Sequence, residues 1–226
     1  MVVFHRSISL VKVYSHVLLD GKAGGVPHVH FMGSEAYVVV SGNGEVETLS
    51  WTEGFRAVSI FPGCVVVMSP GVIHRLVNKE KLEVVVVMEN AGLAEAGDLE
   101  PTILDNERWD TEWILDSRRG LSSRDLAVQG FCRLIASFEE EKEVGRTAIT
   151  SFFCDAAGRL VTRLAEVFRE GRFELSNATR ERIDAINRGD LGYLKEAELR
   201  LLYPDVSNSE RPGFCGMRLT LDDVHG

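Results

Sequence analysis

The sequence lacks any apolar run long enough to cross a membrane. Its longest aliphatic stretches, residues 64–68 and 84–88, have only the length of a β-strand, whereas a spanning helix needs about 20 apolar residues. The apolar residues near the N-terminus are interrupted by charged and histidine side chains, and no small-residue cleavage site follows. This is not the pattern of a secretory signal. We therefore expect a cytoplasmic protein with no membrane partner.

Paired cysteines are also missing. The chain has four cysteines, all far apart and none in a Cys-x-x-Cys pair: Cys64, Cys132, Cys154 and Cys215. This spacing argues against a zinc knuckle and against a redox dithiol. Scattered thiols suit a reducing compartment.

The sequence also lacks an excess of basic residues. Asp and Glu total 34 against 25 Lys and Arg, which gives a net charge of −9, and no Lys/Arg cluster stands out. A protein that binds nucleic acid usually presents a basic face. We therefore expect no nucleic-acid partner. There is also no internal repeat and no low-complexity tract.

The first hundred residues contain short Val-rich runs separated by Gly and Pro. The runs cover residues 36–40, 45–49, 55–61, 64–68, 73–77 and 82–88. Many short β-branched segments at close spacing predict an antiparallel sandwich or barrel. The fold class that we expect is thus mainly β in the N-terminal half.

The remainder changes character. Residues 91–121 show no clear period, whereas apolar residues recur at helical steps from residue 122 onward. The pattern predicts a helix that starts at Ser122 or Ser123, a second over 147–170, and weaker helices near 177–187 and 191–202. We expect a β-barrel over 1–95, an irregular connection over 96–121 and an α-helical region over 122–226. The apolar stripes of the helices pack into a core or, alternatively, face another subunit.

Three of the six histidines fall in one pattern with a glutamate. Residues i and i+2 of a strand point to the same face, so His28 and His30 project two imidazoles into one space. A turn then lets Glu35 enter the same cavity from the next strand, and His74 begins a later strand. Three imidazoles and one carboxylate suit a divalent first-row metal. Iron, manganese, nickel or cobalt in an octahedral field fits a working site better than tetrahedral zinc, which four ligands would fill.

The same residues resemble the two motifs of the cupin superfamily, whose members are RmlC-like jelly-roll barrels. The first motif is matched by His28, His30, Glu35 and Gly42, and the second by Pro62-Gly63, Gly71, His74 and Asn78. The resemblance covers roughly residues 20–90. It implies a jelly-roll barrel with the metal inside its mouth and with His28, His30, Glu35 and His74 as ligands. Lys22, Cys64 and Pro70 depart from the family pattern at turn positions.

Two neighbours of the ligands bear on the chemistry. Tyr37 shares the face of Glu35, and it is our candidate catalytic residue, as a proton donor or a hydrogen-bond partner of the substrate; the alternative is an aromatic that only lines the cavity. Arg75 follows His74 directly and therefore points the other way. With no cation placed inside, an apolar or weakly polar substrate is favoured over a sugar phosphate.

These observations favour a metal-dependent enzyme that acts on a small organic molecule, with a dioxygenase-like oxidoreductase ahead of other chemistries. One alternative is a non-catalytic binding or sensing module, and a further one is a metal-dependent isomerase or decarboxylase. A structural or storage barrel with a vestigial site is the least favoured. The expected cofactor is one divalent transition metal: iron, manganese, nickel, cobalt or zinc. We also expect a homodimer, because cupins commonly pair through barrel strands.

Overall fold

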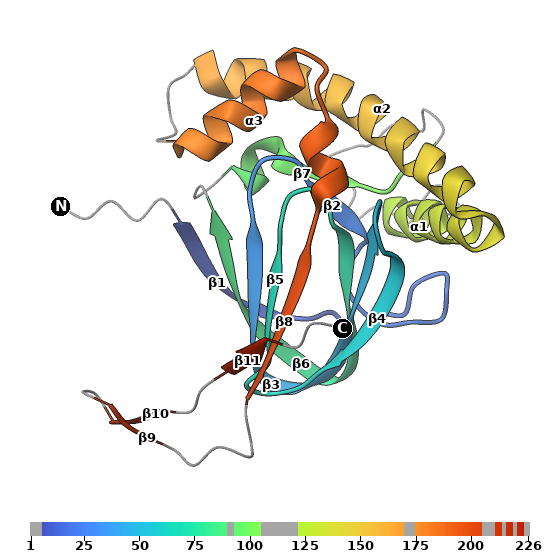
Figure 1. Ribbon diagram of the computed structural model, residues 1–226. Coiled ribbons are helices and arrows are strands. Elements are labelled where there is room, and N and C mark those ends of the chain that lie inside the picture. Colours follow the sequence, from blue (N-terminus) through green and yellow to red (C-terminus); the bar gives the residue numbers. More distant parts are fainter. Residues whose placement is uncertain are drawn as a thin grey trace.

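The computed structural model describes residues 6–89, 93–104, 122–169, 175–204, 211–213, 216–218 and 221–223. Figure 1 shows a β-sandwich with the helices gathered across one end of it. Among the described residues, no helix combines the length and the apolar character that a membrane span requires.

A nine-stranded antiparallel sheet forms the sandwich, in the order β11-β8-β5-β3-β6-β2-β7, with β1 on β6 and β4 on β3. Its strands are β1 (Arg6–Lys12), β2 (His28–His30), β3 (Glu35–Ser50), β4 (Gly54–Ile60), β5 (Val65–Met68), β6 (Ile73–Glu89), β7 (Leu99–Pro101), β8 (Leu199–Pro204) and β11 (Leu221–Asp223). A two-stranded sheet joins β9 (Arg211–Gly213) to β10 (Gly216–Arg218). The helical elements are η1 (Ala94–Asp98, a π-helix), α1 (Ser123–Glu140), α2 (Lys142–Arg169), α3 (Asn177–Asn187) and η2 (Gly192–Glu196, a 3-10 helix).

Strands β3 and β6 are the long central pair, and each changes partners along its length. Val38 pairs with Val65 of β5 and Val85 of β6, whereas Thr48 pairs with Arg56 of β4 and His74 of β6. The sheet therefore folds over itself, and both halves of β3 contribute to the same sandwich. The predicted antiparallel β fold of the N-terminal half is confirmed.

Residues 41–44 and 78–81, which separate predicted strands, form bulges inside this long pair. The predicted strands 36–40 and 45–49 are therefore both part of β3, and 73–77 and 82–88 are both part of β6. The register between β3 and β6 shifts three times between Val39 and Gly44. Gly42 adopts a φ of +71° there, and a Cβ at this position would lie 2.1 Å from the Glu80 carbonyl oxygen. Only glycine fits such a close approach of two strands.

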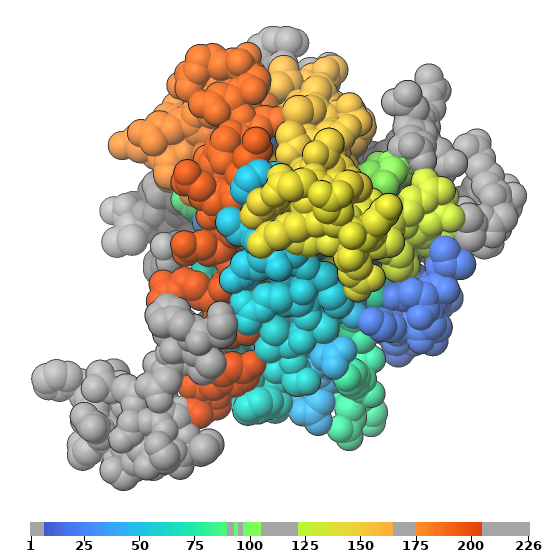
Figure 2. All heavy atoms as spheres, turned by 45° about the vertical axis from the view of Figure 1, so that its right-hand side comes forward, coloured from blue at the N-terminus to red at the C-terminus, as the bar shows by residue number. Residues whose placement is uncertain are grey.

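The molecule has two apolar cores. One fills the sandwich and contains Val46, Val66 and Val84, all fully buried. The other lies between the sheet and the helices, where Phe31 of the barrel contacts Phe153 of α2 with ring centroids 5.8 Å apart. Figure 2 shows how closely the helical part covers the strands beneath it. Helices α1 and α3 lie where the sequence predicts them, α2 begins at Lys142 rather than near residue 147, and Ser122 caps α1 by accepting the Asp125 N–H.

The helix expected over 191–202 is wrong in its second half. Only the short η2 (Gly192–Glu196) is helical. Strand β8 then follows and pairs with β5, with Leu201 opposite Val66. Leu201 is buried where β8 covers β5, so pairing with the edge of β5, and not a helical period, determines this segment. The sandwich therefore takes a strand from the C-terminal part. The boundaries at 95 and 121 stay a prediction, and residues 105–121 lie outside the described residues.

Candidate metal centre

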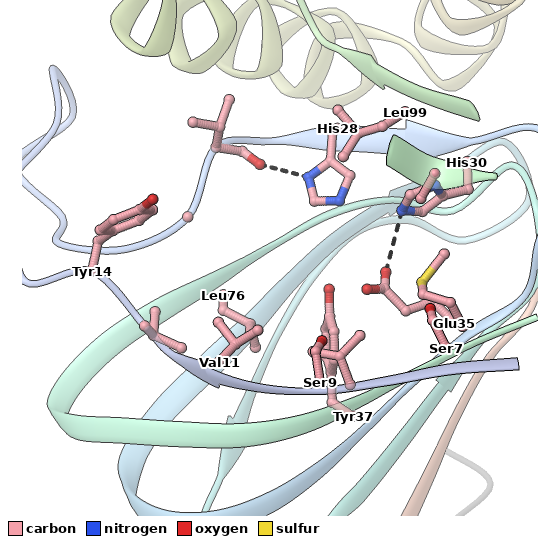
Figure 3. Close-up of a pocket in the computed structure, with 16 residues that line it drawn as sticks. Ser7, Ser9, Val11, Tyr14, His28, His30, Glu35, Tyr37, Leu76 and Leu99 are labelled. Atoms are coloured by element: carbon pink, nitrogen blue, oxygen red, sulfur yellow. Dashed lines mark hydrogen bonds and ion pairs between the residues drawn. The ribbon is translucent and has the colours of Figure 1, made fainter. Parts of the chain in front are cut away.

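The four predicted ligands come together at one end of the sandwich. One ligand atom from each of His28, His30, Glu35 and His74 lies within 4.8 Å of all the others, so the cluster could hold a metal ion. Figure 3 shows His28, His30 and Glu35 turned into the same space. His30, Glu35 and His74 are buried, with exposed fractions of 4%, 7% and 1%.

Strand geometry explains this convergence. His28 and His30 alternate with Val29, which is fully buried against the helices on the other face of β2. His28 is the backbone partner of His74 where β2 pairs with β6. Glu35 is the first residue of β3, so the short turn after β2 returns it to the same cavity. The parity argument from the sequence thus agrees with the structure.

Each histidine ring is oriented by a backbone carbonyl. The Nδ1 atom of His28 donates to the Val26 carbonyl at 2.7 Å. That of His30 donates to the Asp98 carbonyl at 2.9 Å, and that of His74 to the Val72 carbonyl at 2.9 Å. A carbonyl only accepts, so the proton is on Nδ1 and Nε2 is left facing the centre. Such outer hydrogen bonds are the usual support of a metal-ligating histidine.

The three imidazoles and the carboxylate of the cluster shift one another's pKa values. Burial opposes a charge on His30, but Glu35 outweighs it and raises the pKa of His30 to about 9. Burial and the two other imidazoles lower the pKa of His28 to about 3. Burial alone would raise the pKa of Glu35, yet His30 and His74 hold it well below its usual range. One divalent cation in place of the shared protons would satisfy all four donors, so the donor set fits a metal.

A cavity of about 300 Å³ opens beside the cluster. Ser7, Ser9 and Val11 of β1 form one wall, and Figure 3 shows them across from His28. The remaining lining residues are mostly apolar: Val13, Tyr14, Gly25, Val26, Leu76, Val86, Met88, Ala94 and Leu99. No Lys or Arg is among the lining residues that the structure describes.

Tyr37 lines this cavity on the face of Glu35, as its parity predicted. Its ring centroid lies 6.0 Å from that of His74. Burial, followed by the charge and the hydrogen bond of Glu35, raises the pKa of Tyr37 well above its usual value. The hydroxyl therefore keeps its proton next to the ligand cluster.

Arg75 lies outside the site, as expected. Its Nε donates to Glu47 Oε2 at 2.6 Å, and its guanidinium also bonds to Asp20. Asn78 and Cys64 also have structural surroundings. The Asn78 side chain donates to the Val13 carbonyl and accepts the Leu82 N–H, and Cys64 is buried in the sandwich core.

The sequence reasoning missed Asp98, which it placed in an irregular connection. Asp98 ends η1, and β7 then pairs with β2, with Leu99 opposite His30. Its carbonyl orients His30, and burial raises the pKa of its own carboxyl to about 6. The chain separation between Asp98 and His30 is 68 residues, so no local pattern could have joined them.

No protein-family profile matches the chain, and no curated protein sequence is similar to it. Among solved structures, vicilin from Solanum lycopersicum (tomato) is 25% identical over 38% of this chain and 23% of its own, with a TM-score of 0.31. A putative sugar phosphate isomerase from Acidithiobacillus ferrooxidans is 24% identical over 38% of this chain and 51% of its own, with a TM-score of 0.31. The TDP-fucose-3,4-ketoisomerase WlaRA from Campylobacter jejuni is 7% identical over 47% of this chain and 63% of its own, with a TM-score of 0.30. Each alignment covers under half of this chain and less than two thirds of the matched chain.

Proposed function

We propose that the protein is a metal-dependent enzyme, a dioxygenase-like oxidoreductase, that acts on a small uncharged organic molecule. Its metal would be held by His28, His30, Glu35 and His74. The observation that supports this proposal is the convergence of three imidazoles and one carboxylate, of which His28, His30 and Glu35 line a cavity. Catalytic sites typically combine a cluster of this kind with a concave, mostly apolar cavity.

The chemistry divides between the metal and the chain. When bound, the metal supplies a Lewis-acid and redox centre. Tyr37 holds a proton beside Glu35 and can donate a hydrogen bond to a substrate oxygen. The hydroxyls of Ser7 and Ser9 offer further hydrogen bonds from β1.

The lining indicates the class of substrate. A phosphate or carboxylate in this cavity would find no guanidinium or ammonium among the described lining residues. It would also face the carboxylate of Glu35. An unpaired buried charge is costly, so a neutral molecule with one or two hydroxyl groups suits the cavity better than a sugar phosphate does.

Metal analysis of the purified protein tests the site. We expect about one divalent metal per chain in the wild type, since the four donors form one cluster. The His28→Ala/His30→Ala variant should lose it, while the control His16→Ala, at an exposed histidine outside the cluster, should keep it. Equal and negligible metal in the wild type and the double variant would overturn the proposal.

Oxygen uptake tests the reaction. The protein is reconstituted with ferrous iron without oxygen, and uptake is then screened over neutral phenols, enols and diols. Turnover with oxygen consumption that falls in Tyr37→Phe supports the proposal. Turnover without oxygen consumption would point to an isomerase or decarboxylase. Tight binding without turnover across the panel would point to a binding or sensing module.

A further inference from the structure

A buried aspartate clamps the turn that leaves the metal-binding strand. Asp98 is 1% exposed. Its carboxylate accepts three consecutive backbone N–H groups, from Phe31 (2.9 Å) and Met32 (3.0 Å) on one oxygen and from Gly33 (2.9 Å) on the other. Charge-assisted hydrogen bonds of this kind are about twice as strong as neutral ones. The Asp98 side chain therefore binds the backbone N–H groups of three consecutive residues in the turn between His30 and Glu35.

The same residue also holds a ligand ring. The Asp98 carbonyl accepts the Nδ1 proton of His30 at 2.9 Å. The clamp and this contact are coupled, because any shift of the Asp98 backbone moves both the turn and the ring. Asp98 thus connects to two ligands, to His30 directly and to Glu35 through the turn.

A neighbouring carboxylate shows what a purely structural role looks like. Glu100 is equally buried, at 3% exposed. It accepts from Arg159 (2.6 Å) and Arg163 (2.5 Å), which belong to α2. Glu100 is the β-sheet partner of Val29, so it lies on the face of β2 that is turned away from the histidines. Its contacts anchor a helix and reach no ligand.

We propose that Asp98 is a positioning residue of the metal centre, which presents His30 and spaces it from Glu35. This inference rests on the proposed metal site. The Asp98→Asn variant keeps the size of the side chain but replaces an acceptor oxygen with an NH₂ group, which would face a backbone N–H. The turn then loses at least one of its hydrogen bonds, and the ligands lose their preset geometry.

The test measures the affinity for Co²⁺ alone, by calorimetry and by the visible absorption of the bound ion. Wild type is compared with Asp98→Asn and with the control Glu100→Gln. We expect Asp98→Asn to weaken Co²⁺ binding about 10- to 100-fold, as is typical of outer-shell changes, and to alter the spectrum. Amide hydrogen exchange at residues 31–33 should accelerate in Asp98→Asn. Glu100→Gln should lower the stability to urea but leave the affinity, the spectrum and the exchange of the turn unchanged.

The outcomes separate the two proposals. If the wild type binds Co²⁺ and folded Asp98→Asn binds it as tightly, the positioning role is wrong. It is also wrong if Glu100→Gln weakens binding equally, because the effect would then be one of general stability. A wild type that binds no divalent metal overturns the proposed function instead. Should Asp98→Asn fail to fold, Asp98→Glu, which keeps the charge but displaces the oxygens, is measured in the same way with the same expectation.

Discussion

At the scale of single residues, His74 and Arg75 show how one strand serves two unrelated purposes. His74 faces the ligand cluster, while Arg75 is 3% exposed on the opposite face. Its guanidinium bonds to Glu47 and Asp20 and lies over the ring of Phe131 at 5.7 Å. Burial alone lowers the pKa of Arg75, but these two carboxylates raise it above its usual value. The arginine therefore remains charged and joins the sandwich to α1.

Removing Arg75 should be costly for folding and harmless for the metal site. We expect Arg75→Ala to lower the free energy of unfolding by about 1–3 kcal/mol, because the buried Glu47 carboxylate loses one of its two ion-pair partners and keeps only Lys22. Urea unfolding measures this loss, and Co²⁺ titration should show an unchanged affinity.

A double variant provides the control for this prediction. Arg75→Met/Glu47→Leu removes both charges and should recover a large part of the loss, since apolar replacements of a buried pair are often neutral. A double variant as unstable as Arg75→Ala would show that the packing of Arg75 over Phe131, and not its ion pair with Glu47, dominates.

At the scale of elements, Glu89 fastens α3 to the end of the sandwich. It is the last residue of β6, and its carboxylate accepts from the Ser34 N–H at 3.2 Å and from Arg182 of α3 at 3.2 Å. Ser176, the N-cap of α3, donates to its other oxygen at 3.2 Å. One carboxylate thus joins a strand, a turn and a helix.

These contacts predict a pH dependence of stability. Burial alone would raise the pKa of Glu89, but Ser34 and Arg182 lower it below its usual value. A lowered folded-state pKa stabilises the protein above the unfolded value of about 4.3, and the gain disappears as the pH falls through the folded-state pKa. Glu89→Gln should therefore be less stable than wild type by on the order of 1 kcal/mol near neutral pH, and the gap should close in acid.

Urea unfolding at a series of pH values between neutrality and strong acid measures this gap. The exposed Glu53, which pairs with Arg56 on β4, provides a matched control, because Glu53→Gln should track the wild type at every pH. A gap for Glu89→Gln that stays constant down to strong acid would contradict the assignment.

At the scale of the whole molecule, β1 presents an apolar outer face. Among the described strands it pairs only with β6. Ser7, Ser9 and Val11 line the cavity, and the alternate residues Ile8 and Leu10 are 66% and 60% exposed. Large exposed side chains on a strand with a free edge are typical of an association surface.

The homodimer expected from the sequence stays a prediction, and this face is where we expect it to form. An antiparallel pair of β1 strands centred on Ser9 would set Ile8 of one copy beside Leu10 of the other. Sedimentation should show a dimer that Leu10→Lys converts to a monomer. Val144→Lys, at an exposed valine on α2, should leave it unchanged, and a wild type of monomer mass would refute the prediction.

The limits of sequence reasoning follow from the range of the interactions involved. Alternation along a strand predicted that His28 shares a face with His30, and Glu35 with Tyr37, since these relations depend only on local parity. The Gly-containing segment 41–44 separates two predicted strands, yet it is a bulge, because the long β3–β6 pairing continues on both sides of it. The strand β8 was taken for a helix, because its strand character depends on covering the edge of β5.

By itself, therefore, the sequence determined the chemistry of the donor set and the faces on which its members lie, because residue type and a period of two are local properties. It also determined the change from β to helical structure, for the same reason. Only the tertiary structure decided which carbonyl orients each imidazole, that Asp98 clamps the turn between two ligands, and that β1 walls a cavity with no cation among its described lining residues. Those features arise from contacts between residues far apart in the chain, and such contacts exist only once the sandwich and its helices have packed.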